Sequence, residues 1–182
     1  MAKVLGIINI KGGSGKTTTS INLSVYLAAL GKRILLVDFD PQANASVGLG
    51  VKLEKDHYSI YHALVADVEP GALVKKTSIF NLDILPSSES LAGANVELVN
   101  FKNRELQLKK VLNKVKDGYD FVLIDCLPSV GILNVNALAA SDYILIPVQA
   151  EYFALAGLDQ LLRVVDLVKR YLNPDLKILG AV

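Results

Sequence analysis

The chain has 182 residues, of which 52% are hydrophobic and 20% are charged, and its mean hydropathy is +0.39. This balance excludes an intrinsically disordered protein and suits a sheet that helices cover on both faces. The formal net charge of +1 neither supports nor excludes binding to nucleic acid. The sequence has no apolar run of ~18 residues, no signal peptide and a single cysteine, Cys126. We therefore expect a protein of the reducing cytoplasm.

Apolar segments and helix-like segments alternate along the chain. In chain order, strands are expected at 3–9, 33–37, 82–85, 120–125, 143–148 and 176–182, and helices at 17–30, 42–49, 59–65, 133–139 and 157–172. The stretch 91–116 is helical in one or two pieces, and its lysines are expected to form a solvated face. This alternation predicts an α/β fold with a doubly wound, mainly parallel sheet and helices on both faces.

A glycine-rich stretch, residues 10–19, joins the first expected strand to the first expected helix. Its glycines let backbone N–H groups approach an anion closely, and the start of the helix adds further N–H groups. Lys16 supplies a charge for terminal phosphates, and the Thr17 hydroxyl can bind Mg²⁺. The stretch predicts a nucleotide-binding loop that consists of Lys11, Gly12, Gly13, Ser14, Gly15, Lys16, Thr17 and Thr18.

Aspartates stand at the ends of two other expected strands, Asp38 and Asp40 after one and Asp125 at the end of another. Since ligands bind at the carboxyl ends of strands in such sheets, we expect these side chains to meet the loop. A buried, unpaired carboxylate costs several kcal/mol, so Asp125 requires a cation nearby. A buried salt bridge or helix cap is the alternative for Asp125, and a turn before Pro41 is the alternative for Asp40.

These motifs resemble the ParA/MinD family of P-loop ATPases, in which an early lysine, here Lys11, marks a deviant Walker A loop. Residues 37–44 are similar to the second motif of the family and residues 121–125 to its Walker B strand. Residues 146–152, Ile-Pro-Val-Gln-Ala-Glu-Tyr, resemble a segment of the Soj/ParA partition branch. The sequence departs from the family at Ile10, where Gln or Gly is usual, and at Leu127, in a segment that commonly reads Asp-x-Pro-Pro.

The resemblance implies roles for individual residues. Lys11 is expected to cross a dimer interface to the phosphates of the partner, and Asp40 to orient or deprotonate the attacking water. Together with Lys16 they are the expected catalytic residues. Thr17, Asp38 and Asp125 are the expected magnesium-site residues, with Asp125 acting through a metal-bound water.

The resemblance also implies a function. An ATP-binding and ATP-hydrolysing switch would dimerise with ATP, bind DNA non-specifically and respond to a ParB-like partner, so that chromosomes, plasmids or other cargo are segregated on the nucleoid. We expect residues 1–182 to form one domain that lacks the C-terminal portion carrying the adenine contacts and most DNA contacts.

Three alternatives stay open. A MinD-like membrane-cycling ATPase would need a basic amphipathic helix, and a reductase resembling nitrogenase iron protein would need paired cysteines. A metabolic kinase or amidoligase on the same fold would hydrolyse ATP at a rate that DNA leaves unchanged.

Overall fold

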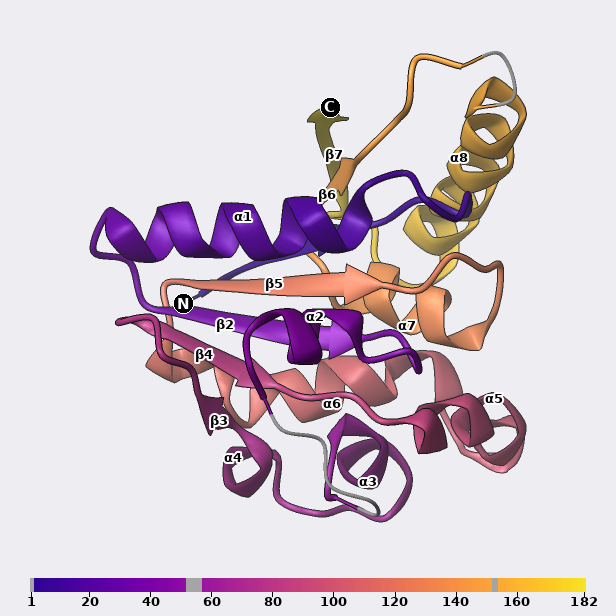
Figure 1. Cartoon of the computed structure of the whole chain (residues 1–182). Coiled ribbons are helices and arrows are strands. Elements are labelled where there is room, and N and C mark those ends of the chain that lie inside the picture. Colours follow the sequence, from indigo (N-terminus) through magenta and orange to yellow (C-terminus); the bar gives the residue numbers. More distant parts are fainter. Residues whose placement is uncertain (1, 52–56, 152–153) are drawn as a thin grey trace.

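The computed structural model describes residues 2–51, 57–151 and 154–182, and its strands form one sheet (Figure 1). The strand order is β3-β4-β2-β5-β1-β6-β7. The strands are β1 (Lys3–Ile7), β2 (Ile34–Phe39), β3 (Lys75–Lys76), β4 (Leu82–Leu85), β5 (Phe121–Cys126), β6 (Tyr143–Ile146) and β7 (Lys177–Ala181). Every pair of neighbours is parallel except β3 and β4, so the predicted doubly wound, mainly parallel sheet is confirmed.

Helices cover both faces of the sheet. On one face lie α1 (Lys16–Ala29) and α2 (Asn44–Gly48), as Figure 1 shows. The helices that pack with the other face are α3 (Ile60–Val65), α4 (Pro70–Leu73), α5 (Ala94–Glu97), α6 (Gln107–Asn113), α7 (Ile132–Ala140) and α8 (Ala154–Tyr171). Within the described ranges, none of these helices is both long and apolar enough to cross a membrane.

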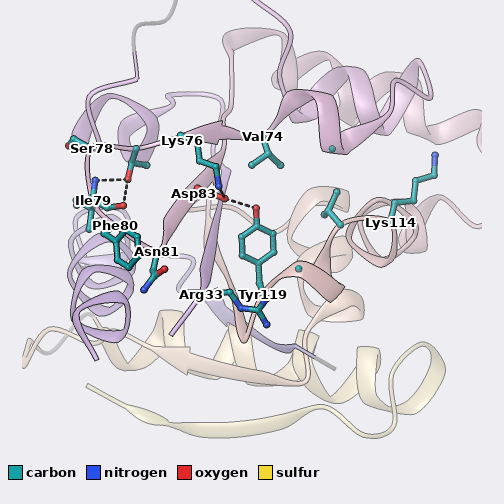
Figure 2. Close-up of a pocket in the computed structure, with 14 residues that line it drawn as sticks. Arg33, Val74, Lys76, Ser78, Ile79, Phe80, Asn81, Asp83, Lys114 and Tyr119 are labelled. Carbon is teal, nitrogen blue, oxygen red and sulfur yellow. Dashed lines mark hydrogen bonds and ion pairs between the residues drawn. The ribbon is translucent and has the colours of Figure 1, made fainter. Parts of the chain in front are cut away.

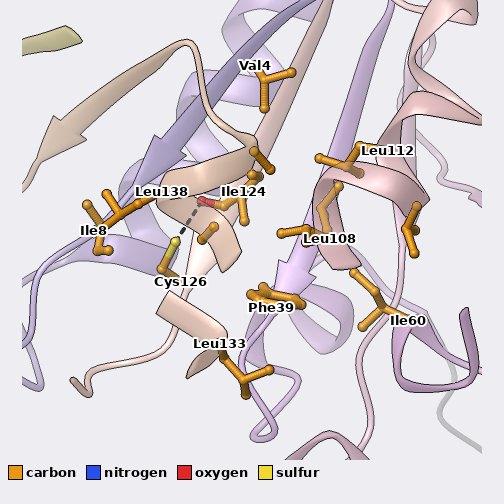
Figure 3. Close-up of a cluster of buried hydrophobic side chains, with 14 of the residues drawn as sticks. Val4, Ile8, Phe39, Ile60, Leu108, Leu112, Ile124, Cys126, Leu133 and Leu138 are labelled. Carbon is orange, nitrogen blue, oxygen red and sulfur yellow. Dashed lines mark hydrogen bonds between the residues drawn. The ribbon is translucent and has the colours of Figure 1, made fainter. Parts of the chain in front are cut away.

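The central strands β1, β2, β4 and β5 are mostly apolar, as suits strands that are buried on both faces. In β2, Ile34 and Leu36 pack with α1, whereas Leu35 and Val37 join the larger hydrophobic cluster on the opposite face. Figure 3 shows part of that larger cluster, with Phe39 and Ile124 from the sheet beside Leu108 and Leu133 from the helices. The same alternation continues to the end of β2. Asp38 lies two residues after Leu36 and therefore points to the same face of the sheet, that of α1.

The stretch 91–116 is helical, as predicted, but it is divided into short pieces. It consists of α5 and α6 with short 3-10 turns at Glu89–Gly93, Leu98–Asn100, Arg104–Leu106 and Lys116–Gly118. The helical path breaks near Asn103, whose φ of 55° lies in the left-handed region. The helices α5 and α6 are therefore separate pieces, which agrees with the two-piece alternative of the prediction.

The lysines of this stretch are mostly solvated, as predicted, and some of them form ion pairs. Lys102, Lys109, Lys110 and Lys114 are exposed, and Lys116 is half-buried. Lys110 and Lys114 lie 3.3 and 3.5 Å from the Asp67 carboxylate. Two further elements were not predicted: the single helical turn of α4, and β3, whose two exposed lysines carry no apolar signal.

The chain reverses its winding direction between two neighbouring strands, β1 and β5. The connection from β1 leads through α1 to β2, whereas the connection from β5 leads through α7 to β6 on the other side of β1. Such a switch point is where open α/β sheets bind their ligands, outside the carboxyl ends of the strands. The glycine-rich loop follows β1 and Asp125 stands near the end of β5, so both lie at this point.

Candidate nucleotide-binding site

The loop between β1 and α1 has the backbone geometry of an anion cradle. Gly13 and Gly15 have φ angles of 71° and 87°, in the left-handed region that favours glycine. Among the described residues, a Cβ atom at Gly12, Gly13 or Gly15 would meet no atom within 4 Å, so space is open beside these glycines. Gly15 caps α1, and no side chain caps the first amide groups of the helix. These N–H groups can therefore face a bound phosphate.

Lys16 lies in the loop with its side chain largely covered, 6% of the residue being exposed. Its Nζ atom donates a hydrogen bond to the backbone carbonyl of Lys11 at 2.9 Å, which folds the side chain back over the loop. Burial lowers the pKa of Lys16, and the nearby carboxylates of Asp125 and Asp40 oppose that shift. The ammonium group thus stands where terminal phosphates would meet the loop amides.

Asp125 is fully buried at the end of β5. Its Oδ1 atom accepts a hydrogen bond from the Ser20 hydroxyl at 2.8 Å, whereas Oδ2 has no hydrogen bond of good geometry in the described part of the chain. Burial raises the pKa of Asp125 to about 6, against the lowering effect of the Thr17 and Ser20 hydroxyls. The expected alternative, a buried salt bridge, is not formed among the described residues. The Oδ2 side of the carboxylate, with the Thr17 hydroxyl nearby, fits a metal-bound water.

Asp38 stands opposite Asp125 in the parallel register of β2 and β5. One of its oxygens accepts hydrogen bonds from the backbone N–H and the hydroxyl of Ser46, both at 2.7 Å, and the other accepts one from the Asp40 N–H at 3.3 Å. Burial is the main cause that raises the pKa of Asp38 to about 7. The carboxylate thereby fastens α2 to the end of β2, and its expected place near the metal remains a prediction.

Asp40 forms a turn and also lies near the loop. Its Oδ1 atom accepts a hydrogen bond from the Gln42 N–H at 2.9 Å, and its carbonyl accepts one from the Ala43 N–H at 2.9 Å. The turn interpretation is therefore present in the structure. The same carboxylate is close enough to Lys16 and Asp125 to influence the pKa of each. The turn holds the half-buried side chain beside the site, and its catalytic role remains a prediction.

Lys11 has partners within its own chain. Its Nζ atom lies 2.6 Å from the Glu151 carboxylate and 3.3 Å from the Gln149 side-chain oxygen. Its backbone N–H donates to the Asn9 side chain at 3.0 Å. Lys11 is therefore paired within its own chain in this structure, while the expected contact across a dimer remains a prediction. Tyr152, which follows in the Soj/ParA-like segment, lies outside the described residues.

The two departures from the family pattern are accommodated by packing. Ile10 packs against the larger hydrophobic cluster, and a Cβ at Gly157 of α8 would lie 3.6 Å from it. Leu127 is 9% exposed, and its carbonyl accepts a hydrogen bond from the Asn134 amide at 3.0 Å. That amide also donates to the Ser129 carbonyl, so one side chain of α7 fixes the turn after Asp125.

Residues that the sequence analysis missed are Ser20, Ser46 and Asn134. Ser20 lies one helical turn after Lys16 on the buried face of α1. Ser24 and Ala28 follow on the same face. The sequence signal for Ser20 was a hydroxyl on the buried face of the helix that follows the phosphate loop. Nothing local marks Ser46 or Asn134, because their partners come from other elements.

A large cavity of about 910 Å³ lies away from this site, at the amino ends of β2, β4 and β5 (Figure 2). Arg33, Phe80 and Lys114 stand among its walls. The Asp83 carboxylate accepts hydrogen bonds from Lys76 Nζ and the Tyr119 hydroxyl, both at 2.8 Å. These groups satisfy one another, so the cavity carries no signal of a ligand comparable to the loop.

A phosphate loop at a topological switch point, with buried carboxylates on the adjoining strand ends, defines the class of P-loop nucleoside triphosphatases. Comparison with known proteins agrees, since the family described as "AAA domain" matches residues 2–178.

The sporulation initiation inhibitor protein Soj of Bacillus subtilis (strain 168) is 52% identical over 180 residues, which are 99% of this chain and 71% of Soj. The chromosome partitioning protein ParA of Myxococcus xanthus (strain DK1622) is 49% identical over 180 residues, 99% of this chain and 64% of that protein. The chain belongs to the Soj/ParA branch of the ParA/MinD P-loop ATPases.

A solved structure from the same fold is that of cobyrinic acid a,c-diamide synthase from Mycobacterium smegmatis with bound ADP and magnesium. It matches with a TM-score of 0.96 and 41% identity, over 100% of this chain and 74% of that one. The present chain thus spans 64% to 74% of the length of these three proteins.

Proposed function

We propose that this chain is an ATP-driven partition switch, which binds ATP with Mg²⁺, hydrolyses it and changes its association state with the bound nucleotide. The observation that supports this most directly is the open glycine cradle beside Asp125, whose buried Oδ2 atom has no hydrogen bond of good geometry among the described residues. A buried acceptor without a partner is unfavourable unless the functional state supplies one. A magnesium-bound water would supply it.

The loop amides and Lys16 hold the terminal phosphates of ATP in this proposal, and Thr17 and Asp125 hold the metal. The metal neutralises charge on the phosphates when it is bound. The M. smegmatis protein, which holds ADP and magnesium, supports this choice of ligands. Asp40, fixed by its turn, orients or deprotonates the attacking water, and Lys11 reaches the phosphates of a second subunit.

The proposed cellular role is supported by the name of one relative, a chromosome partitioning protein. In this proposal the ATP-bound dimer associates with DNA non-specifically on the nucleoid of the cytoplasm, and a ParB-like partner accelerates hydrolysis. Because the chain spans 71% of Soj and 64% of the M. xanthus ParA, DNA contacts and partner contacts rest on this similarity and not on residues described above.

The first test is sedimentation of the chain with a non-hydrolysable ATP analogue and with ADP. We expect a dimer with the analogue only, because two facing triphosphates repel unless a lysine from each subunit neutralises the other. Lys11→Ala should bind the analogue as a monomer, whereas Lys109→Ala, which removes the same charge from an exposed face of α6, should dimerise as the wild type does. A dimer of Lys11→Ala as stable as that of the wild type would contradict the role of Lys11.

A second candidate function is an ATP-dependent amidoligase, which the similarity to cobyrinic acid a,c-diamide synthase favours. The ATPase rate separates the two proposals. A partition switch should hydrolyse ATP faster in the presence of DNA and a ParB-like protein, whereas an amidoligase should respond to a polycarboxylate substrate and ignore DNA. Binding to anionic lipid vesicles in the presence of ATP would instead favour a MinD-like membrane-cycling ATPase.

A further inference from the structure

The segment that follows β6 is tied to the start of the phosphate loop. The Asn9 amide donates a hydrogen bond to the Pro147 carbonyl at 2.7 Å, and the Asn9 side-chain oxygen accepts one from the Lys11 N–H at 3.0 Å. The Lys11 carbonyl in turn accepts the hydrogen bond of Lys16 Nζ at 2.9 Å. The backbone of Lys11 is thus fixed from both sides, so its side chain has a limited set of directions.

In the structure the Lys11 side chain points to this same segment. Its Nζ atom lies 2.6 Å from Glu151 Oε2 and 3.3 Å from Gln149 Oε1. The Lys11 side chain is 28% exposed and that of Glu151 56% exposed. The pair is therefore accessible to solvent, and it can exchange for another partner without unfolding the loop.

We propose that Glu151 is a positioning residue that holds Lys11 within its own subunit and thereby opposes the nucleotide-dependent dimer. This inference rests on the proposed function, in which Lys11 acts across that dimer. One ammonium group cannot remain 2.6 Å from Glu151 and also reach the phosphates of a partner. Dimerisation must break the pair, and Glu151 competes with the phosphates for the same charge.

The exposure of the pair sets the size of the effect. Exposed ion pairs shift an equilibrium by about 1.5- to 5-fold, because water and salt screen them. A symmetric dimer breaks the pair twice, so the effect on the dissociation constant is squared. Removal of the Glu151 charge should therefore tighten the dimer by about 2- to 25-fold at low salt. This contact is weak enough for a bound triphosphate to overcome and strong enough to measure.

The experiment compares Glu151→Gln with Asp159→Asn in the full chain. Both variants remove one negative charge, but Asp159 pairs with Arg163 at 2.8 Å on the exposed face of α8 and does not contact Lys11. Sedimentation with a non-hydrolysable ATP analogue at low salt should give a dimer dissociation constant about 2- to 25-fold lower for Glu151→Gln. Asp159→Asn should match the wild type. In a Lys11→Ala background, Glu151→Gln should have no effect on association.

A second measurement reads the contact without any dimer. In the nucleotide-free protein, an amine-acylating reagent should label Lys11 about 1.5- to 5-fold faster in Glu151→Gln than in the wild type or Asp159→Asn, as mass spectrometry can quantify. The proposal would be overturned if Lys11 were labelled equally fast in Glu151→Gln and the wild type, or if the dimer of Glu151→Gln were unchanged. A weaker dimer would also overturn it, because Glu151 would then be a contact of the dimer itself. Faster labelling with no ATP-dependent dimer in the wild type would instead contradict the proposed function, and with it the opposing role.

Discussion

Replacing Asp125 by asparagine should stabilise the nucleotide-free protein at neutral pH. The carboxyl group has a pKa of 3.8 when unfolded, and burial raises its pKa to about 6 in the folded chain. The folded state therefore binds the proton more tightly, and the stability from this group is complete below pH 4 and is lost as the pH rises through 6. Asparagine does not titrate, so the variant avoids that loss.

The size of the effect follows from the pKa shift and from the contacts of the side chain. A shift of about 2 units corresponds to about 3 kcal/mol of unfolding free energy above pH 7. In the variant, the Ser20 hydroxyl can still donate to the amide oxygen. The amide nitrogen takes the place of Oδ2, which has no hydrogen bond of good geometry among the described residues. An unpaired buried donor costs about 1–2 kcal/mol, which leaves a gain of about 1–2 kcal/mol.

Thermal unfolding followed by circular dichroism, in EDTA and without nucleotide, measures this gain. For a chain of this size the melting temperature should rise by about 3–6 °C at pH 7.5. At pH 4 the titration gain is nearly lost and the cost of the unpaired amide nitrogen remains, so the variant should melt below the wild type. Asp120→Asn is the control, because Arg33 holds the pKa of that exposed carboxyl below its usual value and its loss should not stabilise the protein. A lower melting temperature of Asp125→Asn at pH 7.5, or a gain independent of pH, would refute the reasoning.

Two further predictions concern the loop and the turn after β2. Lys16→Ala should abolish binding of ATP with Mg²⁺ in calorimetry, because the ammonium beside the loop amides is lost. Undiminished affinity would contradict the assignment of this loop as a phosphate-binding loop. Asp40→Ala should still bind ATP but hydrolyse it about 10²-fold more slowly or worse, the scale of a lost general base, and should accumulate an ATP-bound dimer. Wild-type turnover in that variant, measured by phosphate release, would leave Asp40 as a turn residue only.

Much of the fold and the placement of the candidate site could be predicted from the sequence because they depend on local patterns. Apolar runs set the strands, and parallel pairing brings the carboxyl ends of β1, β2 and β5 to one edge of the sheet. The order Gly12-Gly13-x-Gly15 sets the loop, since two of these glycines adopt left-handed backbone angles. Residues whose position follows from a strand end or a glycine turn, such as Asp125 and Lys16, were therefore placed correctly.

The contacts of those residues could not be predicted, because each depends on an element that is distant in sequence. Ser20 meets Asp125 across 105 positions and Lys11 meets Glu151 across 140. Polar residues at such separations show no periodicity, and their pairing emerges only when the sheet order is fixed. The same holds for Asn103, where a left-handed residue divides a stretch whose apolar spacing is helical throughout.

These distant contacts explain why the loop can be stable without a nucleotide. Glu151 neutralises Lys11, the Lys11 carbonyl receives Lys16, and Ser20 satisfies one oxygen of Asp125. The contacts of Lys11 and Lys16 occupy ammonium groups that the proposed mechanism needs at the phosphates, whereas Asp125 Oδ2 is left for the metal-bound water. Binding of ATP must therefore exchange intramolecular partners for ligand atoms, one group at a time. The exposed pair of Lys11 and Glu151 is the weakest of these contacts, because water and salt screen it most. It is thus the contact at which nucleotide binding is most readily coupled to association with a second subunit.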